Sequence, residues 1–238
     1  MRDPAAPADM ASLVPLVARR ESHEPLALIV GHREFWSLEF AVSPATLIPR
    51  PESETLIETA VAAFAGREPP RLLLDLGTGT GCLLLAALSE FPAAVGIGVD
   101  RSAAAAALAA RNAVALNLAD RALFVCGDWA DALSARFDLV LCNPPYIRTE
   151  DLGSLMPEVV HYEPHTALDG GEDGAGAYRR LVPGLPRLLT PKGVAVLEIG
   201  VGQAETAIGP ARRAGLATEL RPDLRGIPRA LVLRPAPR

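Results

Sequence analysis

The sequence predicts an α/β fold in which helices cover both faces of a mostly parallel sheet. Apolar runs of strand length alternate with helical segments along most of the 238 residues. A glycine-rich turn at residues 77–81 joins one apolar run to a helix, and polar residues stand where other apolar runs end. Ligands of open α/β sheets bind at the carboxyl ends of the strands. The pattern therefore also predicts where a site lies.

The expected elements alternate in the order that such a sheet requires. Before the sheet we expect a short helix at residues 12–20, a β-hairpin at 34–46 and a helix at 52–64. Strands are expected at 71–76, 94–99, 122–126, 137–142, 193–199, 217–220 and 230–233. Helices are expected from residue 82 to 88, at 102–116, at 177–189 with interruptions at Pro183 and Pro186, and at 203–214.

The segment at residues 147–176 is too long for an ordinary connection between a strand and a helix. It contains glycine at positions 153, 170, 171, 174 and 176. Long glycine-rich segments at the edge of a sheet commonly open and close over substrates. We expect this one to be a mobile lid loop.

The glycine turn predicts a nucleotide-type pocket. Asp75 lies near the end of the expected strand at 71–76, Gly77-Thr78-Gly79-Thr80-Gly81 follow, and a helix opens at Cys82. Glycines allow a ligand to approach the backbone closely, but the dinucleotide fingerprint needs a small residue where Cys82 stands. The G-x-G-x-G spacing is instead usual for S-adenosylmethionine sites. We expect Asp75 and the five turn residues to bind that cofactor, with Asp75 near its amino-acid end.

Three further residues complete the predicted cofactor site. Asp100 follows Asp75 by 25 residues, close to the ~20-residue offset of an acidic residue that binds ribose hydroxyls. Asp128 is expected to accept the adenine amino hydrogen and Trp129 to pack on the adenine face. Two alternatives stay open, because Asp100 could be a solvated strand end and Trp129 a core residue.

Asn143-Pro144-Pro145-Tyr146 directly follows the apolar run at 137–142. Proline has no N–H, so its carbonyl can face a pocket without a competing donor, and Asn143 adds a second acceptor. Two acceptors and a flat tyrosine ring suit a planar –NH2 group. We therefore expect N-methylation of an amide or an exocyclic amine, with Asn143, Pro144 and Tyr146 as catalytic residues and Asn143 also beside the cofactor. The alternative is an ordinary turn after a strand.

Composition narrows the classes of protein. The net charge of −5 argues against direct binding of nucleic acid, which relies on basic surface. No apolar run reaches the ~18 residues of a membrane span, and no signal peptide is recognisable. The three cysteines fit no metal-binding template, so we expect no metal site. Buried, reduced thiols in a cytoplasmic protein are the simplest interpretation.

These motifs together resemble the HemK/PrmC family of protein-(glutamine-N5) methyltransferases. Beside the glycine turn and Asn-Pro-Pro-Tyr, the resemblance includes EFWSLEF at 34–40, LIPRPESE at 47–54, YEPHTAL at 162–168 with the glycines that follow, and LEIG at 197–200 with Gln203. The resemblance implies a Rossmann-like class I S-adenosylmethionine-dependent methyltransferase fold with seven strands, the last antiparallel. It further implies that Arg50, Glu52, Glu54 and Glu163 join residues 143–146 in binding the substrate.

The implied reaction transfers a methyl group from S-adenosyl-L-methionine to a protein glutamine and leaves S-adenosyl-L-homocysteine. The implied partner is a peptide chain release factor with its Gly-Gly-Gln motif, and we expect a monomer. Two departures stand out. Ser53 replaces the family's usual threonine but keeps the hydroxyl. We expect residues 1–33 to form only a short helical or irregular segment, a truncated docking region, before a methyltransferase domain at 34–238.

Two other functions remain open. An adenine-N6 methyltransferase acting on DNA or RNA shares Asn-Pro-Pro-Tyr, although the acidic charge and the EFW and YEP segments count against it. A non-catalytic cofactor-binding partner module is the second alternative. The intact glycine, acidic and Asn143 positions count against that one, because a module without activity has no chemical need for Asn143.

Overall fold

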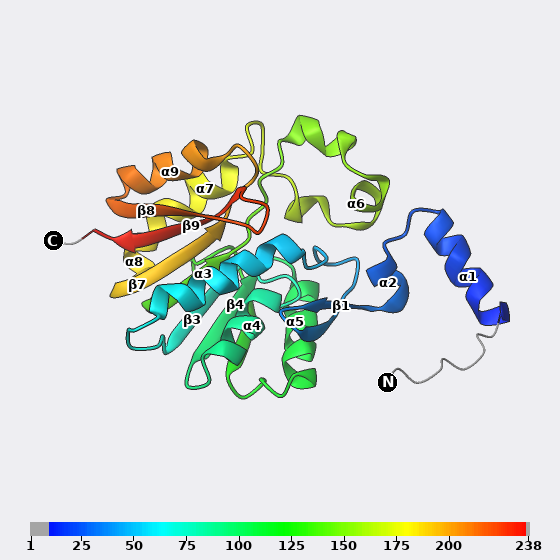
Figure 1. The fold of residues 1–238 in the computed structure, drawn as a ribbon, viewed down its shortest axis with the longest axis horizontal. Coiled ribbons are helices and arrows are strands. Elements are labelled where there is room, and N and C mark those ends of the chain that lie inside the picture. Colours follow the sequence, from blue (N-terminus) through cyan, green and yellow to red (C-terminus); the bar gives the residue numbers. More distant parts are fainter. Residues whose placement is uncertain (1–9, 237–238) are drawn as a thin grey trace.

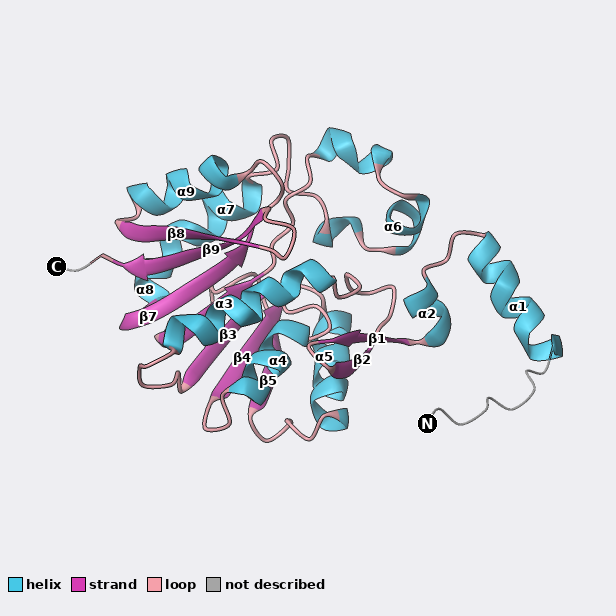
Figure 2. Cartoon of the chain, viewed as in Figure 1, coloured by secondary structure: helices cyan, strands magenta, loops and turns pink. Residues whose placement is uncertain are grey.

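The computed structural model describes residues 10–236, and its centre is a seven-stranded sheet with strand order β5-β4-β3-β6-β7-β9-β8 (Figures 1 and 2). The first five strands along the chain are parallel, and β9 runs antiparallel to both β7 and β8. The predicted seven strands with an antiparallel last strand are confirmed. Their bounds are β3 (Leu72–Leu76), β4 (Val95–Asp100), β5 (Ala122–Cys126), β6 (Phe137–Cys142), β7 (Leu189–Glu198), β8 (Leu216–Pro222) and β9 (Pro228–Pro235).

Strand β7 begins four residues before the start that the sequence predicts. Its pairing with β6 shifts register between Phe137 and Leu139, which pair with Leu189 and Val194. The extra residues of β7 form a bulge, and a Cβ at Gly193 would lie 2.8 Å from the carbonyl oxygen of Phe137. Proline and glycine normally weaken a strand, so the sequence pattern places the strand only after this bulge.

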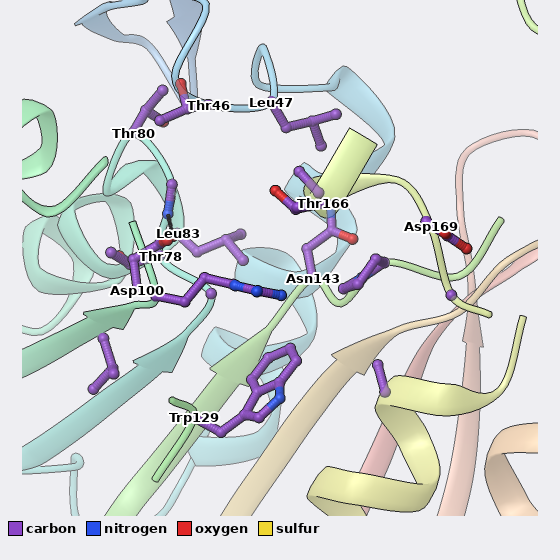
Figure 3. A pocket seen from close by; sticks show the side chains of 18 of the residues that line it. Thr46, Leu47, Thr78, Thr80, Leu83, Asp100, Trp129, Asn143, Thr166 and Asp169 are labelled. Atoms are coloured by element: carbon purple, nitrogen blue, oxygen red, sulfur yellow. Dashed lines mark hydrogen bonds between the residues drawn. The ribbon is translucent and has the colours of Figure 1, made fainter. Parts of the chain in front are cut away.

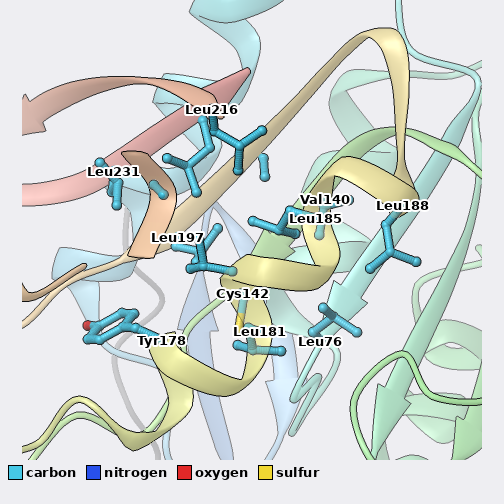
Figure 4. Close-up of a cluster of buried hydrophobic side chains, with 14 of the residues drawn as sticks. Leu76, Val140, Cys142, Tyr178, Leu181, Leu185, Leu188, Leu197, Leu216 and Leu231 are labelled. Carbon is cyan, nitrogen blue, oxygen red and sulfur yellow. The ribbon is translucent and has the colours of Figure 1, made fainter. Parts of the chain in front are cut away.

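Helices pack on both faces of the sheet because successive strand residues point to opposite sides. On one face Leu73 and Leu139 pack with α3 (Glu54–Phe64), α4 (Cys82–Glu90) and the end of α5 (Ala103–Ala115). On the other face Leu74 and Val140 pack with α7 (Gly176–Leu181), α8 (Leu185–Leu188) and α9 (Ala204–Arg213). Figure 4 shows this second core, where Leu181, Leu185 and Leu188 face the strands. The two cores hold the sheet rigid beneath its carboxyl edge.

The hairpin that precedes the sheet is shorter than predicted and starts earlier. It consists of β1 (His32–Phe35) and β2 (Leu38–Ala41), so residues 42–46 lie beyond it. Its two-residue turn places Trp36 and Ser37 at positive φ (53° and 58°), as tight hairpins require. Helices α1 (Met10–Glu21) and α2 (Leu26–Val30) come before it. Residues 1–9 of the predicted N-terminal segment lie outside the described residues, and the division at residue 33 stays a prediction.

The predicted lid segment at 147–176 contains more structure than a loop. It folds into η2 (Thr149–Ser154), α6 (Pro157–Tyr162) and η3 (His165–Ala167). Its ends meet, because Ile147 and Asp169 form a parallel bridge and the Gly170 N–H donates to the Ile147 carbonyl at 2.7 Å. In Figure 1 it projects beyond the carboxyl edge of the sheet. Its mobility stays a prediction.

Candidate active site

The register of the two central strands brings both sequence motifs together. Leu76, the last residue of β3, pairs with Cys142, the last residue of β6. Gly77 and Asn143 are the next residues along, so the glycine turn and Asn-Pro-Pro-Tyr leave the sheet side by side. This point is also where the strand order reverses, since β3 continues to β4 on one side and β6 to β7 on the other. Such switch points form the ligand crevices of open α/β sheets.

A cavity of about 440 Å³ lies at this switch point (Figure 3), within the size range of small-molecule sites. Residues from the loop before α3, the glycine turn, the start of α4, the ends of β4 to β6, the lid segment and α7 line it. They are Thr46, Leu47, Pro49, Arg50, Ser53, Gly77, Thr78, Gly79, Thr80, Cys82, Leu83, Val99, Asp100, Arg101, Gly127, Asp128, Trp129, Asn143, Pro145, Thr166, Ala167, Asp169, Gly170, Gly171, Gly176, Ala177 and Arg180.

The three turn glycines have different tasks. Gly77 and Gly79 line the cavity with positive φ (74° and 55°), so they combine a tight turn with an approachable backbone. Gly81 lies outside the wall at φ 82°, and a Cβ there would come within 3.1 Å of the Ala109 Cβ. Gly81 thus permits close packing around the start of α4, and its predicted contact with the cofactor stays a prediction.

Asp100 ties the glycine turn to β4. Its Oδ2 accepts a hydrogen bond from the Gly79 N–H and its Oδ1 one from the Ser102 N–H, both at 2.9 Å. Each carboxylate oxygen keeps a second lone pair, so this wall residue can also accept hydroxyl donors. Asp128 lines the wall as well and lies 3.7 Å from Arg180.

Trp129 packs against the core and also reaches the cavity, so its predicted contact with the adenine stays a prediction. Figure 3 shows its ring on the cavity side of the strand ends. Its φ of 48° is uncommon for a bulky residue, so the surrounding fold holds the ring in this place.

Asp75 lies beneath the turn rather than in the cavity wall. Its carboxylate is fully buried, and its Oδ2 accepts a hydrogen bond from Thr78 Oγ1 at 2.6 Å. Burial raises the pKa of Asp75 to about 7, and the nearby charge of Asp100 also raises it. Its other oxygen has no partner among the described residues. A contact with the cofactor's amino-acid end therefore has to pass through the turn or through water.

Two wall hydroxyls offer polar groups to a ligand. Thr46 Oγ1 and Thr80 Oγ1 are buried, and neither has a hydrogen-bond partner within residues 10–236. Both residues line the cavity. Because a buried polar group without a partner is costly, these atoms fit a ligand that carries polar groups at this end.

Asn143 projects into the cavity (Figure 3) and is held from behind. Its Nδ2 donates to Ser53 Oγ at 3.1 Å, Ser53 Oγ donates to Glu198 Oε2 at 2.5 Å, and the Tyr146 hydroxyl donates to Glu198 Oε1 at 3.0 Å. Burial raises the pKa of Glu198, while the bonds from Ser53 and Tyr146 lower it.

The three residues after Asn143 lie at different depths. Pro145 lines the cavity, whereas Pro144 is buried and Tyr146 half-buried outside the wall. Stacking of Tyr146 on a substrate stays a prediction.

The four substrate residues implied by the resemblance occupy different places. Only Arg50 lines the cavity, and it forms an ion pair with Glu163 at 2.5 Å. Glu54 accepts the Trp36 N–H at 2.8 Å and so supports the hairpin. Glu52 is half-buried outside the wall. Glu163 and Glu54 therefore hold the surrounding segments, and their direct contact with a substrate stays a prediction.

One prediction about the thiols is wrong. Cys142 is buried and Cys82 half-buried, but Cys126 is exposed. Cys126 ends β5, which is an edge strand of the sheet, and an edge strand is covered less than a central one.

Among residues 10–236 no three metal-binding side chains gather in one cluster. Within the same range no helix is both long and apolar enough for a membrane span.

Several wall or network residues lie outside the sites that the sequence predicts. Glu198 ends β7 as Asp100 ends β4, and a polar residue at the end of an apolar strand was an available signal. Ser53 stands out in the sequence only as a replacement for the threonine that is usual in the family. Thr46, Arg101 and Arg180 carry no local pattern that singles them out, because only the folded chain brings them to the cavity.

Comparison with known proteins agrees with this geometry. Residues 53–172 match the family model described as methyltransferase small domain. The catalytic domain of hMettl16, solved with a MAT2A 3'UTR hairpin, has the same fold with a TM-score of 0.68 and 18% identity, over 96% of this chain and 91% of that one. The ribosomal protein L11 methylase of Lactobacillus delbrueckii subsp. bulgaricus has the same fold with a TM-score of 0.56 and 19% identity, over 79% of this chain and 81% of that one. The fold and site thus define a class I methyltransferase.

Curated relatives make the assignment more specific. The release factor glutamine methyltransferase of Rhodospirillum rubrum is 46% identical over 96% of this chain and 70% of its own length. That of Cereibacter sphaeroides is also 46% identical, over 98% of this chain and 82% of its own. The chain belongs to the release factor glutamine methyltransferase family.

Proposed function

We propose that this chain transfers a methyl group from S-adenosyl-L-methionine to the side-chain amide nitrogen of a protein glutamine, specifically in the Gly-Gly-Gln motif of a peptide chain release factor. The observation that carries the proposal is the pairing of Leu76 with Cys142. This pairing sets the glycine turn directly beside Asn143. The relatives of the chain are named release factor glutamine methyltransferases. Because this substrate takes part in translation, we also propose that the protein acts in the cytoplasm.

The wall residues fit the cofactor. Thr46 and Thr80 present unpartnered hydroxyls for its polar end, Gly77 and Gly79 allow it near the backbone, and Asp100 has lone pairs for ribose hydroxyls. Trp129 supplies an apolar face for the adenine and Asp128 an acceptor for its amino group. When bound, S-adenosyl-L-methionine supplies an electrophilic methyl group on a positively charged sulfur, and S-adenosyl-L-homocysteine is left.

The chain's own residues then act by positioning. An amide nitrogen is a weak nucleophile because its lone pair is delocalised into the carbonyl. Asn143 Oδ1 and the Pro144 carbonyl accept its two hydrogens and so orient the lone pair toward the cofactor side of the cavity. Arg50 and Pro145 limit the space around the glutamine. After transfer the methylated nitrogen loses one proton to water, so no strong base is required.

The two rival functions make different predictions. An adenine-N6 methyltransferase would hold its target amine with the same Asn143 and stacking arrangement. The likeness to hMettl16 concerns the fold alone and does not favour this function. A non-catalytic partner module would bind cofactor without turnover. Membership in the release factor glutamine methyltransferase family favours glutamine over both.

The test incubates the purified chain with methyl-labelled cofactor and, separately, with a bacterial release factor, single-stranded DNA, duplex DNA and RNA. We expect label in the release factor alone, and none when its Gly-Gly-Gln glutamine is replaced by alanine. Label in a nucleic acid would establish the first rival. Cofactor binding in calorimetry without transfer to any of these substrates would favour the second.

A further inference from the structure

A chain of hydrogen bonds runs from the cavity wall into the core and joins three segments that are far apart in sequence. Asn143, after β6, donates to Ser53 of η1 (Pro51–Ser53), which donates to Glu198 at the end of β7. Tyr146 donates to the second oxygen of the same carboxylate. Ser53 and Glu198 are 3% and 2% exposed, so water cannot substitute freely for these partners. Asn143, which lines the cavity, and Tyr146, which lies beside the wall, thus share one buried anchor.

The direction of the chain is fixed by chemistry. An ionised carboxylate only accepts hydrogen bonds, whereas a hydroxyl has one proton to donate. Ser53 gives that proton to Glu198, so it can offer only a lone pair to Asn143. The two ends of an asparagine amide have nearly the same shape, but only its NH2 end can use a lone pair. Glu198 therefore turns the Asn143 carbonyl away from Ser53 and into the cavity.

The surroundings of Glu198 hold the anchor still. The Tyr178 hydroxyl donates to the Glu198 backbone carbonyl at 3.1 Å. A Cβ at Gly200 would lie 3.0 Å from Tyr146 Cδ2, so the tyrosine ring packs closely against this backbone. Burying a carboxylate is costly, and apolar residues of similar volume often replace buried charges without loss of stability. The charge at Glu198 therefore calls for an explanation other than stability.

We propose that Ser53 and Glu198 are positioning residues for the methyl transfer. They set the Asn143 amide with its carbonyl toward the substrate nitrogen, and they hold the Tyr146 ring beside it. This inference rests on the function proposed above. Its consequence is specificity, because the site then accepts a substrate that brings N–H donors and opposes one that presents only acceptors.

The kinetic experiment compares Ser53→Ala, Ser53→Thr and Glu198→Gln with the wild type on a release factor. Loss of an oriented contact that acts in the transition state lowers kcat. We expect Ser53→Ala and Glu198→Gln to lower kcat about 10-fold or more, with the cofactor Kd changed less than about 3-fold. Ser53→Thr keeps the hydroxyl and should restore most of the rate. Thr59→Ala, which removes another buried hydroxyl on α3, is the matched control and should behave as wild type.

A merely structural role would give a different pattern, in which urea stability, cofactor Kd and kcat all decline together. We expect Glu198→Gln instead to keep the midpoint of urea unfolding near that of the wild type. Turnover within 2-fold of wild type in both Ser53→Ala and Glu198→Gln would overturn the proposal.

A second readout does not depend on the substrate. In nitrogen-15-labelled protein, the Asn143 side-chain NH2 signals, assigned by their loss in Asn143→Asp, report the bond to Ser53. They should move in Ser53→Ala and Glu198→Gln and stay in place in Thr59→Ala. Unmoved signals would overturn the anchor even if release factor proved not to be the substrate. Moved signals in a chain that does not methylate release factor would instead place the fault in the proposed function.

Discussion

Arg50 and Glu163 form an ion pair with an N–O distance of 2.5 Å, which joins the loop before α3 to the lid segment. The Glu163 side chain is 1% exposed and that of Arg50 34%. Glu163 also accepts the Ile48 N–H through its second oxygen at 3.2 Å. One buried carboxylate therefore holds both sides of the cavity entrance together, since Thr166 and Ala167 of the same lid segment line the wall.

Replacing Glu163 by glutamine should loosen the lid segment. Breaking a fully buried pair costs about 3–5 kcal/mol, but Arg50 is a third exposed, so we expect on the order of 1–2 kcal/mol after allowing for solvent screening. Hydrogen exchange should show faster exchange across residues 147–176, and KM for the protein substrate should rise. Glu150→Gln, on an exposed ion pair of the same segment, is the control. Unchanged protection at 147–176 would show that other contacts hold the segment.

Asn143→Ala should separate chemistry from cofactor binding. The variant loses an acceptor that orients the substrate amide, so kcat should fall by roughly 10²-fold or more. Cofactor affinity should stay within a few-fold, because the glycine turn, Asp100 and Trp129 remain. Stopped-assay kinetics and calorimetry measure the two effects. Near-normal turnover would remove Asn143 from the mechanism.

Asp100→Ala should weaken cofactor binding by about 1.5–3 kcal/mol, the range for hydrogen bonds to a charged group. Part of that loss has a structural origin, since Asp100 also accepts the N–H groups of Gly79 and Ser102. Calorimetry on Asp100→Asn, which keeps one acceptor oxygen, should give a smaller loss. An unchanged Kd in the alanine variant would show that Asp100 does not contact the cofactor.

Asp75 predicts a pH dependence of stability. Its pKa is about 7 in the folded chain but about 4 in an unfolded one. Between these values the folded state keeps a proton that the unfolded state has lost, so its contribution to stability is complete below pH ~4 and disappears as pH rises through ~7. Urea unfolding of wild type and Asp75→Asn at several pH values should show a steeper decline in the wild type, because the raised pKa of Glu198 acts in both proteins. Parallel curves would mean that Asp75 is ionised throughout.

Gly174→Ala should disturb the site through the backbone. Gly174 has φ 72°, and a Cβ there would come within 2.5 Å of both the Tyr146 carbonyl oxygen and Gln203 Nε2. These two atoms form a hydrogen bond of 2.7 Å. We expect a loss on the order of 2–3 kcal/mol in unfolding free energy, together with a lower kcat. Gly153→Ala is the control, because a Cβ at Gly153 would have no atom within 4 Å. Its unfolding free energy should stay within about 0.5 kcal/mol of wild type.

Local patterns predicted much of this molecule. The apolar runs at 71–76 and 137–142 predicted two central strands, because their residues face helices on both sides of the sheet. The residues that follow these runs lie together at the carboxyl edge of the sheet. The Ser53–Glu198 contact could not be predicted from sequence, since it depends on how α3 lies across β7. The exposure of Cys126 depends on strand order, which no single strand reveals. The bulge before Val194 depends on pairing with β6, and the local Pro-Lys-Gly run argues against a strand there.

The position of β9 has a consequence for the synthesis of the chain. It is the last strand of the sheet along the chain, yet it lies inside the sheet between β7 and β8. Until residues 228–235 emerge, β8 has no neighbour to pair with and the outer edge of β7 stays open. Open edges invite pairing with other chains, and non-local pairings form slowly. A nascent or C-terminally truncated chain would therefore carry the complete glycine turn and Asn-Pro-Pro-Tyr while remaining prone to aggregate, and chaperones would meet it in that state.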